Sequence, residues 1–148
     1  CSSDLLGEKT MADYIAALPM SLFFLDFDHN SPNAEHLKAH HESFFLNIRE
    51  KNPDLPVIMA TKTDIPRSPA AEKSNAAHRE VVYETYENAV KRGDRNVIFI
   101  DGATVFSKAL TLSAPADSCT VDGCHPNDLG FACMAKVFGD AIEKMLGL

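Results

Sequence analysis

The chain lacks the features that mark several common classes of protein. Its 148 residues include no tryptophan and only four cysteines, and no two cysteines form a Cys-x-x-Cys pair. A zinc ribbon or a thioredoxin-type redox site is therefore not expected. No apolar run approaches the roughly 18 to 20 residues that a membrane-spanning helix needs. Neither Gly-x-Gly-x-x-Gly nor Gly-x-x-x-x-Gly-Lys occurs, so no phosphate-binding loop is predicted.

Basic residues are also scarce, because 14 lysines and arginines stand against 21 acidic residues and give a net charge of −7. Binding to nucleic acid or to an anionic membrane is disfavoured, since both require a basic surface patch. The length and the 45% share of apolar residues suit one globular domain over residues 1–148.

The cysteines and the first residues leave two questions open. Cys119 and Cys124 are close enough in sequence to bridge across a loop, although free thiols are the preferred interpretation. The opening Cys1-Ser2-Ser3-Asp4 suits either a lipoprotein processed at its cysteine or a cut within a longer chain. The sequence therefore predicts no cellular compartment.

The remaining pattern alternates strands with helices, which is typical of an α/β fold with a mostly parallel sheet. Apolar runs predict strands at 22–27, 56–60 and 96–100. Helical spacing predicts helices at 8–18, from Ser31 to about 51, at 70–92 and from Pro126 onward, with Ser31-Pro32 capping the second of them. We therefore expect a three-layer fold in which helices cover both faces of the sheet.

The spacing of apolar residues also predicts which helix faces are buried. The expected core residues are Leu37, His41, Phe44, Phe45 and Ile48 in the second helix, and Met134, Val137, Phe138, Ala141, Ile142 and Met145 in the last. In an open α/β sheet, ligands bind beyond the carboxyl ends of the strands. The loops 28–31, 61–69 and 101 onward lie at that end, and the loop 122–125 is expected to join them.

The loop before the last helix contains the most informative residues. Asp122 and His125 are three positions apart in Asp122-Gly123-Cys124-His125-Pro126. This spacing allows the carboxylate to reach the imidazole Nδ1, which fixes the tautomer and leaves Nε2 free to accept a proton from a hydroxyl nucleophile. A helix cap that happens to contain a histidine is the alternative interpretation of these five residues.

The longer run from Asp122 to Gly130 closely resembles the last block of the SGNH (GDSL-type) hydrolases, which are esterases and acyl hydrolases. The resemblance implies a flavodoxin-like fold, with His125 as general base and then general acid and Asp122 as its orienting partner. The strand 22–27 followed by Asp28-His29-Asn30 is similar to the family's third block. By that resemblance Asn30 would donate a hydrogen bond to the oxyanion, and the substrate would be a small ester or an acylated carbohydrate.

The chain departs from the family pattern at three places. Asp28 and Ser31 stand where the third block usually has glycine and aspartate. The Gly-Asp-Ser nucleophile block and the family's first two strands have no counterpart, so the resemblance implies an N-terminally incomplete domain. Ser2 and Ser3 fall where the second block would lie and, like His29, are candidates to line the pocket. The strand 22–27 would then be a bare sheet edge, which we expect a missing N-terminal segment or a partner chain to cover.

Two further interpretations are kept open. The chain could be a non-catalytic fragment or module of the same fold, with no nucleophile of its own. A weaker alternative is a metal-dependent hydrolase that uses His36 and His40, which are one helical turn apart. The preferred interpretation assigns these histidines to an ordinary amphipathic helix, so no metal or organic cofactor is expected. Among the remaining candidates, we expect His78 to be packed, Asp64 and Arg67 to lie on a solvated loop, and Asp101 to cap the turn that it shares with Gly102.

Overall fold

The computed structural model describes residues 6–110 and 115–148, and its centre is a sheet of three parallel strands. The strands are β1 (Phe23–Leu25), β2 (Val57–Ala60) and β3 (Val97–Ile100), in the spatial order β1-β2-β3. Phe23 is paired with Val57, and Val57 with Val97, so the strands begin side by side and end at one edge. All four residues of β2 are buried, as expected for a strand that is covered on both faces.

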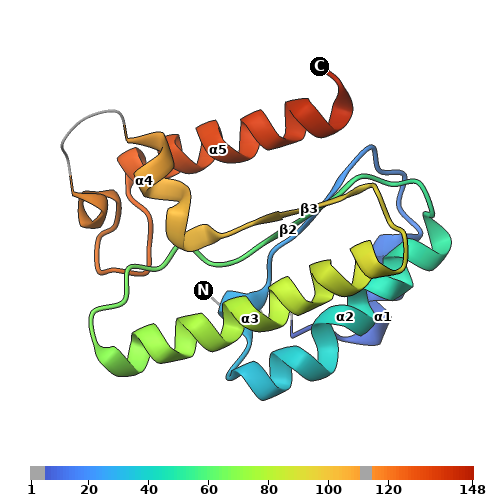
Figure 1. Ribbon diagram of the computed structural model, residues 1–148, viewed down its shortest axis with the longest axis horizontal. Helices are drawn as coiled ribbons and strands as arrows, with labels where there is room; N and C mark the ends of the chain where they lie inside the picture. Colours follow the sequence, from blue (N-terminus) through green and yellow to red (C-terminus); the bar gives the residue numbers. More distant parts are fainter. Residues whose placement is uncertain (1–5, 111–114) are drawn as a thin grey trace.

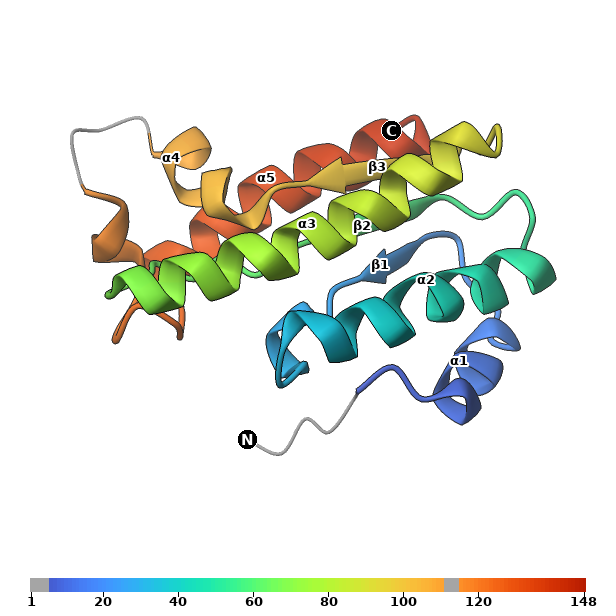
Figure 2. The same ribbon diagram turned by 60° about the horizontal axis from the view of Figure 1, so that its bottom comes forward.

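Helices cover both faces of the sheet, as Figures 1 and 2 show. One face lies against α1 (Lys9–Ala16), α2 (Ala34–Lys51) and α3 (Pro69–Lys91), and the other lies against α4 (Val105–Ala109) and α5 (Asp128–Leu146). Three short 3₁₀ helices complete the described elements: η1 (Asp28–Asn30), η2 (Gly102–Thr104) and η3 (Ala116–Cys119). This arrangement confirms the expected three-layer α/β fold.

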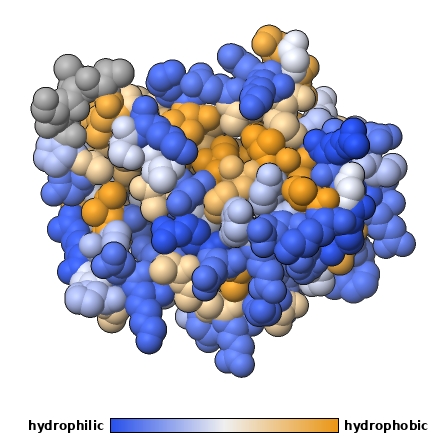
Figure 3. Space-filling model, viewed as in Figure 1, coloured by the Kyte–Doolittle hydropathy of each residue, from blue (hydrophilic) through white to orange (hydrophobic). Residues whose placement is uncertain are grey.

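The hydrophobic core is divided by the sheet into two clusters. The cluster under α1, α2 and α3 contains the predicted stripe of α2, and all five residues of that stripe are buried. The cluster under α4 and α5 contains the predicted stripe of α5, whose side chains are only partly buried. On the side of the molecule seen in Figure 1, apolar side chains gather over the strands between α5 and α3 (Figure 3).

The start of α2 differs from the prediction that Ser31 caps it. The cap is Asn33, whose side-chain Oδ1 accepts a hydrogen bond of 2.8 Å from the backbone N–H of His36. Ser31 is buried two residues earlier, where its Oγ lies 3.0 Å from Nδ1 of His36 and its carbonyl oxygen 3.3 Å from Nε2 of His78. Because Ser31 makes these tertiary contacts, its side chain does not cap α2. Asn33, whose residue type also favours the capping position, caps the helix instead.

The edge of β1 bears on the expected partner segment. Among the residues that the structure describes, β1 is paired only with β2 and no strand lies along its other edge. Coverage of this edge by a further segment or a partner chain stays a prediction. Within the same described ranges, no helix combines the length and the apolar character that crossing a membrane requires.

Candidate functional site

The turn that carries Asp122 and His125 is closed by backbone contacts at its base. Thr120 and Pro126 form an isolated antiparallel bridge, and the N–H of Val121 donates a 2.9 Å hydrogen bond to the carbonyl oxygen of His125. The helix α5 begins directly after this turn, with Asn127 as its cap, which confirms the predicted helix start. The turn is therefore fixed at both ends, and its side chains project from a defined backbone.

Asp122 and His125 form the predicted pair. Oδ2 of Asp122 lies 2.7 Å from Nδ1 of His125, and Oδ1 accepts hydrogen bonds from the backbone N–H groups of Cys124 and His125 at 2.9 and 2.8 Å. The hydrogen bond from the His125 backbone, followed by that from its imidazole, holds the pKa of the Asp122 carboxyl well below its usual range. The carboxylate therefore stays ionised and fixes Nδ1–H as the donor.

The imidazole of His125 is accessible from solvent. Its side chain is 73% exposed, and no described residue forms a hydrogen bond with Nε2. This nitrogen can therefore accept a proton from a group that approaches from outside the described part of the chain. A histidine that only capped a helix would not need a carboxylate at Nδ1 together with an accessible Nε2. The residue that caps α5 is Asn127, not His125.

Gly123 allows this turn to contact the loop that follows β2. Its φ of +96° lies in the region that favours glycine. Its carbonyl oxygen accepts a 2.6 Å hydrogen bond from the N–H of Ile65, and a Cβ at this position would meet Nε of Arg67 at 2.6 Å. Any other side chain would push the two loops apart.

The helix η1, which carries His29 and Asn30, is anchored by Asp28. The Asp28 side chain is 1% exposed, and both of its oxygens accept the backbone N–H of Lys62 at 3.1 Å. Burial raises the pKa of this carboxyl although the hydrogen bond from Lys62 opposes the change. The residue that replaces the usual glycine of the family's third block thus connects η1 to the loop after β2.

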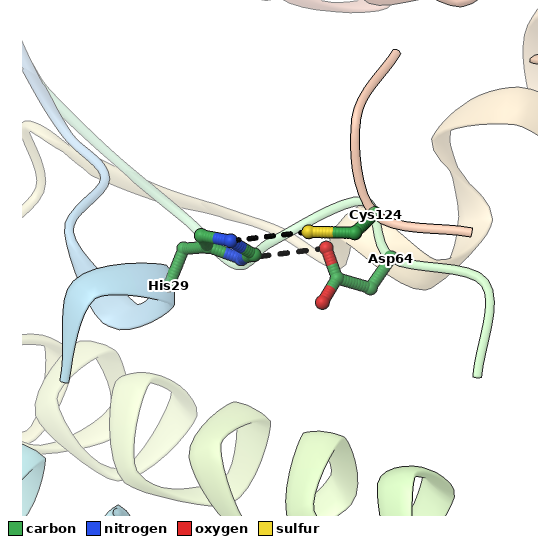
Figure 4. A group of neighbouring side chains, drawn as sticks. All are labelled: His29, Asp64 and Cys124. Atoms are coloured by element: carbon green, nitrogen blue, oxygen red, sulfur yellow. Dashed lines mark hydrogen bonds and ion pairs between the residues drawn. The ribbon is translucent and has the colours of Figure 1, made fainter. Parts of the chain in front are cut away.

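His29 reaches from η1 toward the other two loops, as Figure 4 shows. Its Nδ1 lies 3.4 Å from Oδ1 of Asp64, and its Nε2 lies 3.3 Å from Sγ of Cys124. The contact with the Asp64 carboxylate raises the pKa of His29, while burial raises the pKa of the Cys124 thiol. Asn30 is the next residue of η1, so its loop lies beside the turn that holds Asp122 and His125.

The structure corrects the prediction that Asp64 lies on a solvated loop. Asp64 does not lie on a solvated surface, since its side chain is only 16% exposed and contacts His29. Its partner is 35 positions away along the sequence, so local pattern gave no signal for the contact. Arg67 is exposed, as expected for this loop. Asp101 caps the turn with Gly102 by accepting the N–H of Ala103, which confirms that prediction.

The other histidines form no second candidate site. His78 is 2% exposed and packed, as predicted. Nδ1 of His36 faces Ser31 Oγ and Nδ1 of His40 faces the carbonyl oxygen of His36, so each ring has a partner. Among the described residues, the groups of side chains close enough to hold a metal include neither of them.

The thiols were expected to be free, and Cys119, Cys124 and Cys133 are free. Among the described cysteines, the thiol in contact with Cys119 is that of Cys133, with the sulfur atoms 3.9 Å apart, and not that of Cys124. Ser2 and Ser3, the candidates to line the pocket, lie outside the described residues.

Comparisons with known proteins agree with the resemblance. Residues 2–143 match the model of the GDSL-like Lipase/Acylhydrolase family. A solved structure from Bacteroides ovatus, described as a GDSL-like lipase, is 28% identical, with a TM-score of 0.81 over 96% of this chain and 41% of that one. The salicylyl-acyltransferase SsfX3 from a tetracycline biosynthetic pathway is 23% identical, with a TM-score of 0.75 over 95% of this chain and 42% of that one, which shows a common fold.

The chain thus spans about two fifths of the length of both structures. A search of curated proteins found no match.

Proposed function

Because the chain belongs to the GDSL-like lipase/acylhydrolase family, we propose that it carries the acid–base part of an active site for the hydrolysis of a carboxylic ester. His125 and Asp122 are the proposed catalytic residues, and Asn30 is the proposed oxyanion donor. His29, Ser2 and Ser3 are the proposed residues that line the pocket. The proposed substrate is a small ester or an acylated carbohydrate, which the family supports only at the level of acyl chemistry.

One observation carries the proposal: the 2.7 Å contact between Oδ2 of Asp122 and Nδ1 of His125, with Nε2 accessible. The ionised carboxylate holds the tautomer in which Nε2 has a free lone pair, and it stabilises the imidazolium that forms when this nitrogen takes up a proton. Two backbone N–H groups hold the same carboxylate in place, so the imidazole is supported by a fixed partner.

The reaction then requires two proton transfers at the same nitrogen. A hydroxyl nucleophile attacks the acyl carbon and gives its proton to Nε2 of His125, while the carbonyl oxygen becomes an oxyanion. When Nε2 returns this proton to the oxygen of the leaving alcohol, the ester C–O bond breaks and the acyl group stays on the nucleophile. Water repeats the sequence to release the acid.

Asn30 is suited to the oxyanion because of where η1 holds it. It ends a helix that Asp28 fixes to the loop after β2, and its neighbour His29 contacts the catalytic turn through Cys124. An amide donor placed in this way typically contributes about 10²- to 10³-fold to kcat.

The second candidate function is a non-catalytic module of the same fold. No described serine or threonine hydroxyl forms a hydrogen bond with Nε2 of His125, and this observation favours the second candidate. The two functions differ in whether the protein contains a hydroxyl that becomes acylated.

Labelling with a fluorophosphonate probe, read by intact mass and peptide mapping, separates the two. We expect one label on one serine, and hydrolysis of p-nitrophenyl acetate, in the unchanged protein. Both should be lost in His125→Ala, and the Asp122→Asn variant should hydrolyse the ester about 10³- to 10⁴-fold more slowly, because it loses the correct tautomer.

The matched control is Asp140→Asn, which removes an exposed carboxylate paired with Lys136 on the outer side of α5. This variant should label and hydrolyse as the unchanged protein does. A protein whose circular dichroism shows that it is folded, and that nevertheless takes up no label, would overturn the expectation that this chain hydrolyses esters by itself, in favour of a non-catalytic module or a fragment that lacks its nucleophile. A label that survives His125→Ala would overturn the role proposed for His125.

A further inference from the structure

Three side chains with different donor atoms, His29, Asp64 and Cys124, lie close together at the carboxyl edge of the sheet (Figure 4). The imidazole of His29 comes from η1, the carboxylate of Asp64 from the loop after β2, and the thiol of Cys124 from the turn before α5. One donor atom from each residue lies within 4.8 Å of the other two. Three separate segments of the chain thus bring nitrogen, oxygen and sulfur donors within 4.8 Å of one another.

The three segments are held together by contacts that do not involve these side chains. Asp28 connects η1 to the backbone of Lys62, two residues before Asp64. The N–H of Ile65 donates to the carbonyl oxygen of Gly123, which joins the residues directly adjacent to Asp64 and Cys124. The convergence therefore follows from the backbone arrangement and would persist if the three side chains changed partners.

The spacing of the donor atoms suits a tetrahedral metal ion. Metal–ligand bonds of about 2.1 Å to nitrogen and about 2.3 Å to sulfur place those two atoms about 3.6 Å apart. Nε2 of His29 and Sγ of Cys124 are 3.3 Å apart, so a shift of a few tenths of an ångström brings these two atoms to that separation. The carboxylate of Asp64 lies within 4.8 Å of the other donors and would turn from Nδ1 of His29 toward the ion. The contact between Nδ1 of His29 and Asp64 is 3.4 Å, longer than an ordinary N–H···O hydrogen bond, so the carboxylate is not firmly committed to the ring.

The charges around the thiol also favour a cation. The carboxylates of Asp64 and Asp122 both act on Cys124, and Lys62 opposes them with its ammonium group 3.9 Å from Oδ2 of Asp64. Two negative charges against one positive charge leave a net attraction for a divalent ion.

We propose that His29, Asp64 and Cys124 bind a divalent zinc-type ion, with water in the remaining position. Nε2 of His29, Sγ of Cys124 and a carboxylate oxygen of Asp64 are the ligands, and the thiol releases its proton as the ion binds. Thiolate and imidazole together select zinc over magnesium or calcium, which prefer oxygen. The proposal does not depend on the proposed hydrolysis.

A second group, Asp122, Cys124 and His125, shares the cysteine and is the competing arrangement. It is less suitable, because a metal bound between Asp122 and His125 would compete with the 2.7 Å contact between Oδ2 of Asp122 and Nδ1 of His125. Its carboxylate and imidazole are 50% and 73% exposed, against 16% and 45% for Asp64 and His29. The two groups make opposite predictions for substitutions at the two histidines.

Titration with Co²⁺ tests the site, because cobalt replaces zinc in such sites and absorbs light when a thiolate binds it. We expect the chelator-treated, reduced protein to bind one Co²⁺ with a thiolate charge-transfer band, and one equivalent of Zn²⁺ to remove the band. The band should be absent in Cys124→Ser. Zinc affinity, measured by calorimetry, should fall in His29→Asn and in Asp64→Asn by more than the roughly 10- to 100-fold that the loss of an outer-shell partner of a ligand costs.

Two controls locate the site. His125→Asn should bind Co²⁺ and Zn²⁺ as the unchanged protein does, and so should His40→Asn, which alters a histidine of α2 that has a backbone partner. Zinc should also raise the Tm of the unchanged protein but not that of Cys124→Ser. A cooperative thermal transition in each of the two proteins shows that both are folded. A charge-transfer band that survives Cys124→Ser, a band lost in His125→Asn but kept in His29→Asn, or no band at all would overturn the proposal.

Discussion

The two sides of the sheet hold their side chains in place by different means. Under α1, α2 and α3, residues such as Phe44 and Ile48 are at most 1% exposed and are fixed by close packing. On the other side, the core face of α5 is partly buried, and the turn before it depends on hydrogen bonds to neighbouring loops. The candidate acid–base pair, Asp122 and His125, belongs to this second side. Its residues can remain exposed because backbone bonds, and not burial, determine their positions.

The two sides should differ most in how much stability is lost when one aromatic residue on each side is replaced by alanine. Phe44 packs against the rings of Phe23 and Phe27, whereas Phe138 of α5 meets one ring, Phe24, edge-on at 4.9 Å. Phe44→Ala should lower the free energy of unfolding by about 3–5 kcal/mol, since it leaves a cavity in a closed core. Phe138→Ala should lower the free energy of unfolding by about half as much. The side chain of Phe138 is only partly buried, so folding removes less of its apolar area from water. Urea denaturation monitored by circular dichroism measures both.

Leu46→Ala provides the control, because this residue of α2 is 41% exposed. It should change the free energy of unfolding by less than about 0.5 kcal/mol. Equal losses for Phe44→Ala and Phe138→Ala would contradict the comparison. They would mean that the α5 side is as fully covered in solution as the other side, for example by the segment expected along β1.

The second prediction concerns pH and contrasts a packed histidine with the exposed ones. His41 is fully buried, its Nδ1 lies 2.9 Å from Oγ1 of Thr85, and its Nε2 has no hydrogen-bond partner among the described residues. Burial lowers the pKa of His41 to about 4. Below about pH 6.5 the His41 side chain is protonated in the unfolded chain but stays neutral in the folded protein. Its contribution to the free energy of unfolding is therefore complete above that pH and is lost as the pH falls toward 4. The contribution amounts to about 3 kcal/mol.

The difference in unfolding free energy between the unchanged protein and His41→Leu isolates this contribution. Other groups also titrate in this range; the raised pKa of Asp28, for example, acts with the opposite sign. The difference should decrease by about 3 kcal/mol from pH 7 to pH 4. His40→Gln, which alters a partly exposed neighbour, should show no such change. A difference that is constant with pH would mean that His41 is protonated inside the folded protein.

The contrast between the two sides also explains how much the sequence could predict. Burial repeats with the period of the helix, so the spacing of Leu37, His41 and Phe45 was sufficient to predict the core face of α2. The pairing of Asp122 with His125 was predictable for a similar reason, because both residues lie within one short turn. Each of these signals is contained in a few consecutive residues.

Contacts between loops leave no such signal. The contact of His29 with Asp64 and Cys124 joins positions that are 35 and 95 residues apart, and neither spacing has any meaning until the strands are aligned. Ser31 and Asn33 were equally suitable caps by residue type, and the contact of Ser31 with His78, 47 positions away, decided between them. The sequence therefore predicts the elements and the local pair, but not the way in which loops combine to form a site.

The smallest effect is expected at Gly123, where one residue serves both the fold and the site. An added Cβ would meet the carbonyl oxygen of Ile65 at 2.8 Å on a backbone with φ +96°. Gly123→Ala should therefore lower the free energy of unfolding by about 1–3 kcal/mol. It should also weaken zinc binding, because the loop that holds Asp64 and the turn that holds Cys124 must move apart.

Two other glycines separate the causes. Gly93 has φ +89° but no neighbouring atom within 4 Å, so Gly93→Ala should cost about 1 kcal/mol from backbone strain alone and leave zinc binding unchanged. Gly139 lies within α5 with open space around it, and Gly139→Ala should raise stability by about 0.5–1 kcal/mol. If Gly123→Ala matched Gly93→Ala in both stability and zinc affinity, the contact between the two loops would not be what positions the site. If Gly123→Ala instead reduced both stability and zinc affinity while Gly93→Ala left zinc affinity unchanged, the hydrogen bond from Ile65 to Gly123 would be the contact that holds the two loops at the distance that the donor atoms need.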